Sequence, residues 1–490
     1  MNKKTLLLLI LILLLGSFLR FYNLGKESFW QDESYTALAV KKYSAVDIIK
    51  NSVDMGQIIP DAKYTYNSEL PSYFFIVKVW SDIFGISEFS LRAFSAIFGI
   101  LSLTAIFHLA RYIFNEKAAL LASFLTAINL TLIWYSQEAR PYSFLLFLSL
   151  LSLILLLKAF KEGKAYYVLG LLLTNLIIIY THFTWIIFVL FEGVYALYVT
   201  YKDYVSKKKF HAKVLLVFIV LALFYLPIVG RALFSGDQTL YLSGRPDIIE
   251  LGQFGVRLHT WIYPTESMRQ KLYGFSFDFS IYEWLLLFSV LSSSFIVGLL
   301  FIAGLAKLAY KKRHNIVLLL MFFFPLLFAL IFSFVHPSIS VFNIRILVYV
   351  IPAYLIIVSL GYLKSKQFKA LIVITVVLST LPIYAYYSNV DKQQFREASS
   401  FLPKNELIFI NKDTAKRGVW YYYGEKDNVI GINDVSDLKS HLNNTNSFWV
   451  LLTFTKYSDP EGKIKKYLDE NYKLADKKEF FDIELLHYRK

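Results

Sequence analysis

The sequence predicts an α-helical membrane protein that crosses the bilayer many times and ends in a small α/β domain. Hydrophobic residues make up 56% of the chain and come in long blocks, which is too apolar for a soluble globular protein. Lysine and arginine gather in short segments between these blocks, as in the cytoplasmic loops of membrane proteins. From residue 388 onward the composition becomes that of a soluble domain of ordinary size.

Apolar blocks of sufficient length predict about eleven transmembrane helices. They span residues 5–19, 93–112, 117–135, 141–159, 165–181, 183–200, 213–231, 281–306, 315–335, 343–362 and 369–387. The segment 71–80 is apolar but short, so we expect a helix that lies in the membrane interface. With that choice every lysine-rich loop falls on the cytoplasmic side. The loop 20–92 and residues 388–490 are then extracytoplasmic.

The N-terminal apolar run resembles a secretory signal. The residues after it offer no small-x-small cleavage site, so we expect the run to stay as an anchor with a cytoplasmic N-terminus. The formal charge of +15 does not indicate nucleic-acid binding, because the basic residues follow the membrane topology. The chain has no cysteine, which excludes disulfides and thiolate metal sites.

The predicted domains are 1–387 in the membrane and 388–490 outside it. In the second, residues 406–411 and 448–453 look like buried strands, 435–442 and 462–471 like helices, and 480–488 like a closing strand. No part of this segment combines a nucleophile, a base and an acid. We therefore expect a solvated cap without catalytic residues.

Residues 29–34 read Phe-Trp-Gln-Asp-Glu-Ser and place two adjacent carboxylates, Asp32 and Glu33, just after the first span. One interpretation is structural, because acidic side chains suit the first turn of a helix. The other is catalytic, because a carboxylate at the low-dielectric bilayer edge gains basicity and is costly to keep there without a function. The position of the pair favours catalysis.

Residues 135–142 read Tyr-Ser-Gln-Glu-Ala-Arg-Pro-Tyr, between two predicted spans on the outer side. Pro141 suits the first turn of the second helix, where its missing N–H costs nothing. Glu138 and Arg140 fit an ion pair at a helix end. Alternatively, Arg140 binds a phosphate, since a guanidinium makes paired hydrogen bonds to phosphate oxygens.

The order and spacing of four segments resemble those of the dolichyl-phosphate-mannose protein mannosyltransferase family and its bacterial and archaeal relatives. The segments are 29–33, 70–74, 84–92 and 135–142, with a weaker echo at 343–345. Members of this family are integral-membrane glycosyltransferases of the GT-C type. The resemblance implies a GT-C fold and a donor made of a sugar on a polyprenyl phosphate.

The resemblance also implies roles for individual residues. Asp32 matches the family's catalytic Asp and would act as the base of an inverting displacement, with Glu33 as its neighbour for orientation or acceptor binding. Arg140 and Arg345 are the candidates for binding the donor phosphate. For Arg345 in particular, the alternative is that the side chain snorkels at the membrane boundary.

Three further residues are candidates for substrate binding: Glu138, Tyr142 and His182. For His182, packing among aromatic side chains is the alternative. We expect no cofactor, and the sequence does not argue for a metal ion. The expected partners are the lipid-linked donor, a protein or glycolipid acceptor and membrane lipids.

Two other classes of protein remain open. A transporter or flippase of lipid-linked sugars also carries charges at the outer level. Transporters often show matching halves, however, whereas the motifs of this chain lie in its first third. The third class is a non-catalytic subunit that binds a partner through its C-terminal domain.

Overall fold

The computed structural model describes residues 1–50, 71–234, 245–260, 268, 271, 278–308, 313–336, 341–442 and 445–490. Packing divides the chain into two compact units. Unit 1 comprises Met1–Tyr22, Tyr64–Tyr73 and Ala93–Ser388, and unit 2 comprises Asn23–Lys63, Phe74–Arg92 and Asn389–Lys490. The predicted domains follow chain order, whereas unit 2 also takes in segments of the predicted loop 20–92.

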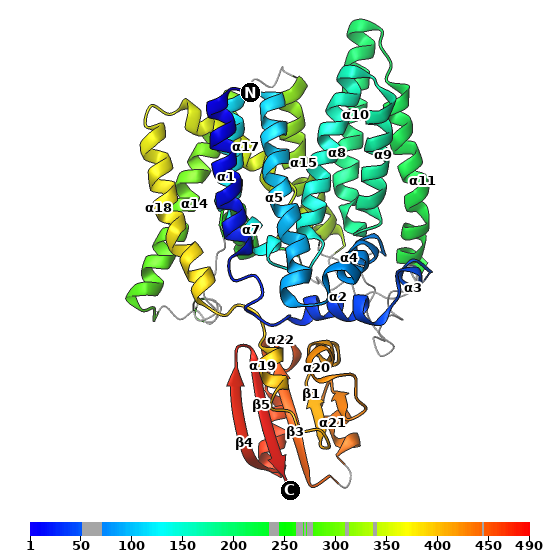
Figure 1. Cartoon of the computed structure of the whole chain (residues 1–490), viewed down its shortest axis with the longest axis vertical. Coiled ribbons are helices and arrows are strands. Elements are labelled where there is room, and N and C mark those ends of the chain that lie inside the picture. Colours follow the sequence, from blue (N-terminus) through cyan, green and yellow to red (C-terminus); the bar gives the residue numbers. More distant parts are fainter. Residues whose placement is uncertain are drawn as a thin grey trace. The chain divides into compact units, whose positions relative to one another are not determined.

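Unit 1 is built from helices, and its long helices run alongside one another (Figure 1). The helical elements of this unit are α1 (Lys3–Phe21), α5 (Glu88–Ile113), α6 (Glu116–Ile128), α7 (Leu130–Ser136), α8 (Tyr142–Glu162), α9 (Ala165–Ile179), η2 (Phe183–Trp185), α10 (Ile186–Lys207), α11 (Ala212–Phe234), α12 (Ile248–Arg257), α14 (Ile281–Lys307), α15 (Arg313–Val335), α16 (Ile344–Leu347), α17 (Val350–Lys364) and α18 (Phe368–Ser388). The first residues of α5, up to Arg92, pack with unit 2.

The helical membrane fold is confirmed. In the described part of the chain, seven helices are long and apolar enough to cross a membrane, and one bent pair, α6 with α7, would make an eighth span. Three shorter apolar helices lie at Ala165–Ile179, Ala212–Ile228 and Val350–Lys364. Together these fall at the eleven predicted positions. The predicted helix at 71–80 is present as α4 (Pro71–Phe84).

The break between α6 and α7 was not predicted, and it sets the direction of the helix that leads into the motif at 135–142. The two helices meet at 63°. Asn129 stands at the break, where its Oδ1 accepts a hydrogen bond from the Leu132 N–H at 3.0 Å and so caps α7. Its Nδ2 donates to the carbonyls of Leu258 and His259, both at 3.0 Å. One side chain thus ends a helix, starts the next and ties both to the segment after α12.

Arg20 fixes α1 to the same region. Its guanidinium is 1% exposed and donates to the carbonyls of Gly16, Ala127 and Thr126, each at 3.2 Å. The last two carbonyls lie at the C-terminal end of α6, where free carbonyls and the helix dipole favour a cation.

Close backbone contact joins α14 and α17. A Cβ on Gly304 would overlap the carbonyl oxygen of Ile357, and a Cβ on Gly361 would overlap that of Leu300. Small residues let membrane helices approach this closely. Such packing contributes to helix association in a membrane, where lipid provides no hydrophobic driving force between helices.

Unit 2 contains a five-stranded mixed sheet with the order β2-β1-β3-β5-β4. The strands β2, β1 and β3 are parallel, and β3, β5 and β4 are antiparallel. The strands are β1 (Leu407–Ile410), β2 (Val429–Gly431), β3 (Ser447–Thr453), β4 (Lys473–Phe480) and β5 (Ile483–Arg489). The helical elements are α2 (Gln31–Lys42), α3 (Ala45–Lys50), α4 from Phe74, α19 (Phe395–Ser399), η3 (Asp413–Ala415), α20 (Lys416–Tyr423), α21 (Val435–His441), α22 (Thr455–Ser458) and α23 (Lys463–Asn471).

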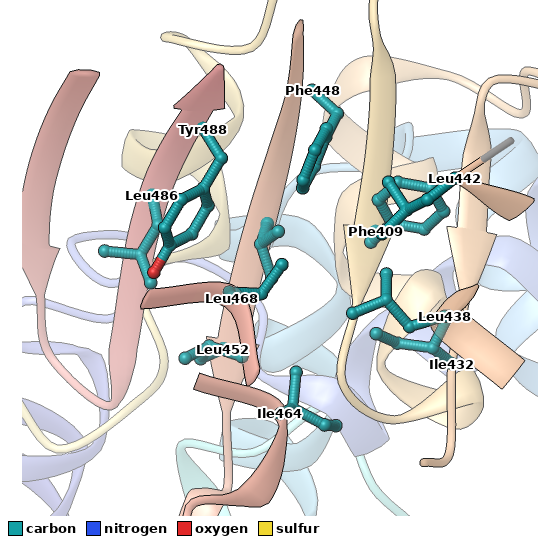
Figure 2. Close-up of a cluster of buried hydrophobic side chains, with 11 residues drawn as sticks. Phe409, Ile432, Leu438, Leu442, Phe448, Leu452, Ile464, Leu468, Leu486 and Tyr488 are labelled. Atoms are coloured by element: carbon teal, nitrogen blue, oxygen red, sulfur yellow. The ribbon is translucent and has the colours of Figure 1, made fainter. Parts of the chain in front are cut away.

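The core of the sheet follows the two-residue period of its strands. Phe448 and Leu452 of β3 and Tyr488 of β5 face the helices α21 and α23, which contribute Leu438 and Leu468 (Figure 2). The two predicted helices and the first two predicted strands are present. The closing strand predicted at 480–488 was wrong in extent, because a turn separates β4 from β5 within it, and β2 and most of β4 were missed. β4 is mostly exposed, which hid it from a search for buried strands.

Candidate active site

Asp32 and Glu33 lie in the first turn of α2, as the acidic pair at a helix start suggests. Their environments differ. Glu33 is 0% exposed, whereas Asp32 is half-buried. Successive residues of a helix point about 100° apart, so adjacent carboxylates cannot share one environment. One of them is held inside unit 2 and the other is accessible.

Glu33 is the centre of a buried cluster of charges. Its two oxygens accept hydrogen bonds from Arg92 Nε at 2.8 Å and Nη2 at 2.7 Å. Lys392 Nζ donates to the first of these oxygens at 3.2 Å. Arg92 is 2% exposed and Lys392 5% exposed. The paired, charge-assisted geometry is the strong form of this interaction.

Arg92 also organises the loop before α2. Its guanidinium donates to the carbonyls of Leu24 at 3.0 Å, Glu27 at 2.8 Å and Ser28 at 3.0 Å. The loop is therefore wrapped around one arginine side chain. The catalytic assignment of Glu33 stays a prediction, and its contacts in the structure hold this loop and α2 together.

Phe29, the first residue of this motif, is tied to the C-terminal part of unit 2. The Phe29 N–H donates to Tyr422 Oη at 2.7 Å, and Tyr422 Oη donates to Glu88 Oε1 at 2.8 Å. Burial raises the pKa of Tyr422, so the hydroxyl keeps the proton that it donates. Arg396 pairs with the same Glu88 oxygen at 3.0 Å. Two of the four sequence motifs thus meet on one side chain.

In unit 1, the motif at 135–142 runs from the end of α7 to the start of α8. Gln137 Nε2 donates to the carbonyls of Arg20 at 3.1 Å and Tyr22 at 2.9 Å, and Tyr386 donates to its Oε1 at 2.7 Å. These bonds anchor the turn. Glu138 accepts a bond from Trp134 Nε1 at 2.7 Å.

Arg140 is 7% exposed, and its carbonyl accepts a hydrogen bond from Ser95 Oγ at 3.1 Å. A guanidinium this deeply buried needs partners for its charge. Tyr142, which is 4% exposed, packs its ring 5.1 Å from that of Tyr135.

Tyr135 connects the motif to two later arginines. It lies within electrostatic range of Glu138, Arg345 and Arg257. Arg345 is the second residue of α16, and its N–H donates to Oδ1 of the N-cap residue Asn343 at 2.9 Å. Arg257 was not predicted, and its signal in the sequence is its place as the last, basic residue of the amphipathic helix α12.

His182 belongs to the same unit and is 4% exposed. Its Nδ1 is 2.8 Å from Thr184 Oγ1. Burial lowers the pKa of His182, and the charge of Arg140 lowers it further, so the ring is neutral at physiological pH. The turn that carries it is joined to the motif at 70–74, because the Ser72 N–H donates to the carbonyl of Tyr180 at 3.0 Å.

The structure thus groups the predicted residues within each unit. Tyr135, Glu138, Arg345 and the unpredicted Arg257 form one electrostatic cluster in unit 1, and Arg140 lies close to His182. Asp32 and Glu33 belong to unit 2. Within the residues that the structure describes, no group of three or more His, Asp or Glu is arranged to hold a metal ion.

Ser447, His487 and Glu406 meet near the first residue of β3. Ser447 Oγ donates to Glu406 Oε2 at 2.7 Å and lies 2.7 Å from His487 Nε2. The Glu406 oxygen is 3.4 Å from the same ring nitrogen. A catalytic triad needs the acid and the nucleophile on opposite nitrogens of the imidazole, so this arrangement does not fit nucleophilic catalysis.

Solved structures share the fold of this chain. ArnT from Cupriavidus metallidurans in the apo state superposes with a TM-score of 0.59 at 11% identity, covering 98% of this chain and 97% of that chain. ArnT bound to undecaprenyl phosphate gives 0.54 at 12% identity, with the same coverage. AglB from Archaeoglobus fulgidus, in complex with an inhibitory peptide and a dolichol-phosphate, gives 0.51 at 13% identity, covering 93% of this chain and 70% of that chain. The chain has the GT-C membrane fold.

Sequence comparison gives matches to part of the chain and to one relative. The family model described as dolichyl-phosphate-mannose-protein mannosyltransferase matches residues 68–226, which confirms the resemblance seen in the motifs. An uncharacterised protein of Aquifex aeolicus (strain VF5) is 28% identical over 410 residues, covering 79% of this chain and 70% of that protein. The fold and the family match together indicate a membrane glycosyltransferase.

Proposed function

We propose that this protein transfers a sugar from a polyprenyl phosphate to an acceptor hydroxyl on the extracytoplasmic side of the membrane. Asp32 takes the proton of the hydroxyl as that oxygen attacks the anomeric carbon of the sugar. The bond from this carbon to the phosphate oxygen breaks, and polyprenyl phosphate leaves. A single displacement inverts the anomeric configuration. Phosphate leaves without a protein acid, so one base suffices.

The difference between Asp32 and Glu33 is the observation that carries this assignment. A base must reach the proton that it removes. Glu33 is fully buried and accepts three hydrogen bonds from Arg92 and Lys392, whereas Asp32 is accessible at the start of α2. Of the two adjacent carboxylates, Asp32 is therefore the one able to meet an acceptor.

The donor phosphate requires fixed positive charge, which also stabilises the charge that develops as the phosphate leaves. Arg140 and Arg345 are the proposed contacts, and Arg257 joins them because it lies in the electrostatic cluster around Tyr135. Glu138, Tyr142 and His182 are proposed to contact the substrate. A neutral His182 donates or accepts a hydrogen bond without adding charge.

Two of the structural relatives support the choice of donor. Their structures contain undecaprenyl phosphate in one case and dolichol-phosphate in the other. We extend this chemistry to the present chain as part of the proposal. The acceptor is proposed to be a protein or a glycolipid.

The test is turnover of radiolabelled polyprenyl-phosphate sugars by the purified protein in detergent, for the wild type and for Asp32→Asn. The substitution is nearly isosteric and removes the base, which contributes on the order of a hundred- to ten-thousand-fold in rate. Transfer should collapse while donor binding survives. Asp82→Asn is the matched control, because Asp82 is exposed on α4 and pairs only locally with Lys78 at 2.6 Å.

Near-normal transfer by folded Asp32→Asn would refute the assignment of the base. Loss of donor binding in the same variant would instead make Asp32 part of a binding site. Absence of turnover by the wild type with every donor tested would refute the proposed function itself.

A further inference from the structure

The first turn of α2, which carries Asp32, is held by side chains from the C-terminal part of unit 2. The Gln31 N–H is one of the helix donors that have no partner within a helix. It donates to Gln393 Oε1 at 3.3 Å, 362 positions away in sequence. The Gln31 side chain donates from Nε2 to Thr414 Oγ1 at 2.7 Å. Trp30, the N-cap residue, makes no side-chain capping bond, so the C-terminal residues provide the cap.

Lys412 lies two residues before Thr414, in the segment that follows β1. Its side chain is half-buried, and its ammonium is 4.8 Å from the centroid of the Phe454 ring. It interacts electrostatically with Asp32 and Asp482. Burial lowers the pKa of Lys412, and these two carboxylates oppose that shift. An ammonium that has lost part of its water is stabilised by such anions.

Asp482 is itself fixed, because Gln393 Nε2 donates to its Oδ2 at 2.8 Å. Gln393 therefore contacts both the start of α2 and one of the anions around Lys412. Nearby, the guanidinium of Arg417 lies 4.8 Å from the ring of Tyr35, one helical turn after Asp32. Lys412 thus interacts with Asp32, and Thr414, two residues further on, is hydrogen-bonded to the helix α2 that carries Asp32.

We infer that the C-terminal region is part of the catalytic apparatus and that Lys412 is a positioning residue for the Asp32 carboxylate. The inference rests on the proposed function, in which Asp32 is the base. The attraction of a fixed cation restricts the carboxylate to fewer orientations. A base gains rate when it is held in the geometry of attack, and a small misplacement costs up to about a hundredfold.

Two substitutions separate positioning from stability. Lys412→Met keeps the length and the packing on Phe454 but removes the charge, and Lys412→Arg keeps the charge. Lys404→Met is the control, because Lys404 is an exposed lysine of the same region. The readouts are kcat and KM for a radiolabelled polyprenyl-phosphate sugar, together with the unfolding temperature of each variant.

We expect Lys412→Met to lower kcat roughly ten- to a hundredfold with KM for the donor nearly unchanged, and Lys412→Arg to recover most of that loss. A wild-type kcat in Lys412→Met, or an equal loss of kcat in both Lys412 variants, would overturn the inference. In either case an active wild-type protein would leave the proposed function standing. An inactive wild type would overturn both.

The geometry has a test that does not depend on activity. The chain has no cysteine, so a cross-link between two introduced cysteines shows that those two positions lie close together. Gln31→Cys with Thr414→Cys should be joined by a short bismaleimide, which bridges thiols too far apart for a disulfide. Gln31→Cys with Lys473→Cys should not be joined. Gln393 contacts Gln31 and also Asp482, which lies two residues after the Phe480 end of β4. Lys473 is at the opposite end of this strand, about 23 Å away. Failure of the first pair to cross-link in folded protein would also overturn the inference.

Discussion

Neutralising Glu33 should destabilise the protein more than it impairs the chemistry. In Glu33→Gln the side chain keeps its size but loses the charge that faces Arg92 and Lys392, at 2.7 and 3.2 Å. All three side chains are at most 5% exposed. Water cannot replace the lost carboxylate, and the new amide N–H groups point toward N–H donors.

The structure sets the size of the effect. Removing one partner of a buried ion pair costs about 3–5 kcal/mol. Arg92 keeps its bonds to the carbonyls of Leu24, Glu27 and Ser28, so we expect the lower end, about 3 kcal/mol or roughly a hundredfold in the unfolding equilibrium. Glu425→Gln is the matched control, because its pair with Lys42 at 3.0 Å is exposed and should contribute less than about 1 kcal/mol.

Denaturant unfolding of the purified protein, followed by the fluorescence of its tryptophans, measures both variants. Adding Lys392→Met to Glu33→Gln removes one of the two unbalanced cations. The double variant should therefore be less destabilised than the sum of the single variants, by roughly 1 kcal/mol. Equal unfolding curves for Glu33→Gln and Glu425→Gln would refute the structural role of the buried cluster. Folded Glu33→Gln as inactive as Asp32→Asn would instead restore a catalytic role for Glu33.

Three further predictions follow from the site. Arg140→Lys keeps the charge but loses the paired contact to phosphate, so transfer should fall roughly tenfold or more, whereas Arg345→Lys should be milder; wild-type transfer rates in the first would make Arg140 a boundary anchor. Reporters fused after Asn389 should read as extracytoplasmic and after Lys209 as cytoplasmic, and the opposite pattern would invert the topology. Because burial lowers the pKa of His182, the unfolded state binds more protons below about pH 6.5, so the unfolding midpoint should fall between pH 7 and 5, and less so in His182→Gln.

The membrane fold could be predicted because its signal is repeated along the chain. Each apolar block is long enough to identify by itself. The break at Asn129 could not be predicted in the same way. It depends on one side chain whose amide meets the carbonyls of Leu258 and His259, which are 129 and 130 positions away in sequence. A local pattern carries no information about such a partner.

The same limit applies to the composition of unit 2. Residues 388–490 were predicted as a separate cap without catalytic residues. Their contacts with the loop 20–92, through Gln393, Thr414 and Tyr422, join segments more than 350 positions apart. Each of these side chains is ordinary for a soluble domain. Only folding shows that Gln393 and Thr414 contact the helix that carries Asp32.

The two adjacent acids show where sequence reasoning ends. Their spacing of one residue on a helix already predicts that they face directions about 100° apart, so that a single substrate meets only one of them. Which of the two acids meets the substrate depends on where a buried cation lies. Arg92 was visible in the motif at 84–92, yet its partner could be chosen only once the loop had wrapped around it and Lys392 had reached the same carboxylate. Glu33 is paired with these two cations, which leaves Asp32 as the accessible acid. The assignment of the base therefore depends on a cluster of residues that takes no part in the proposed reaction.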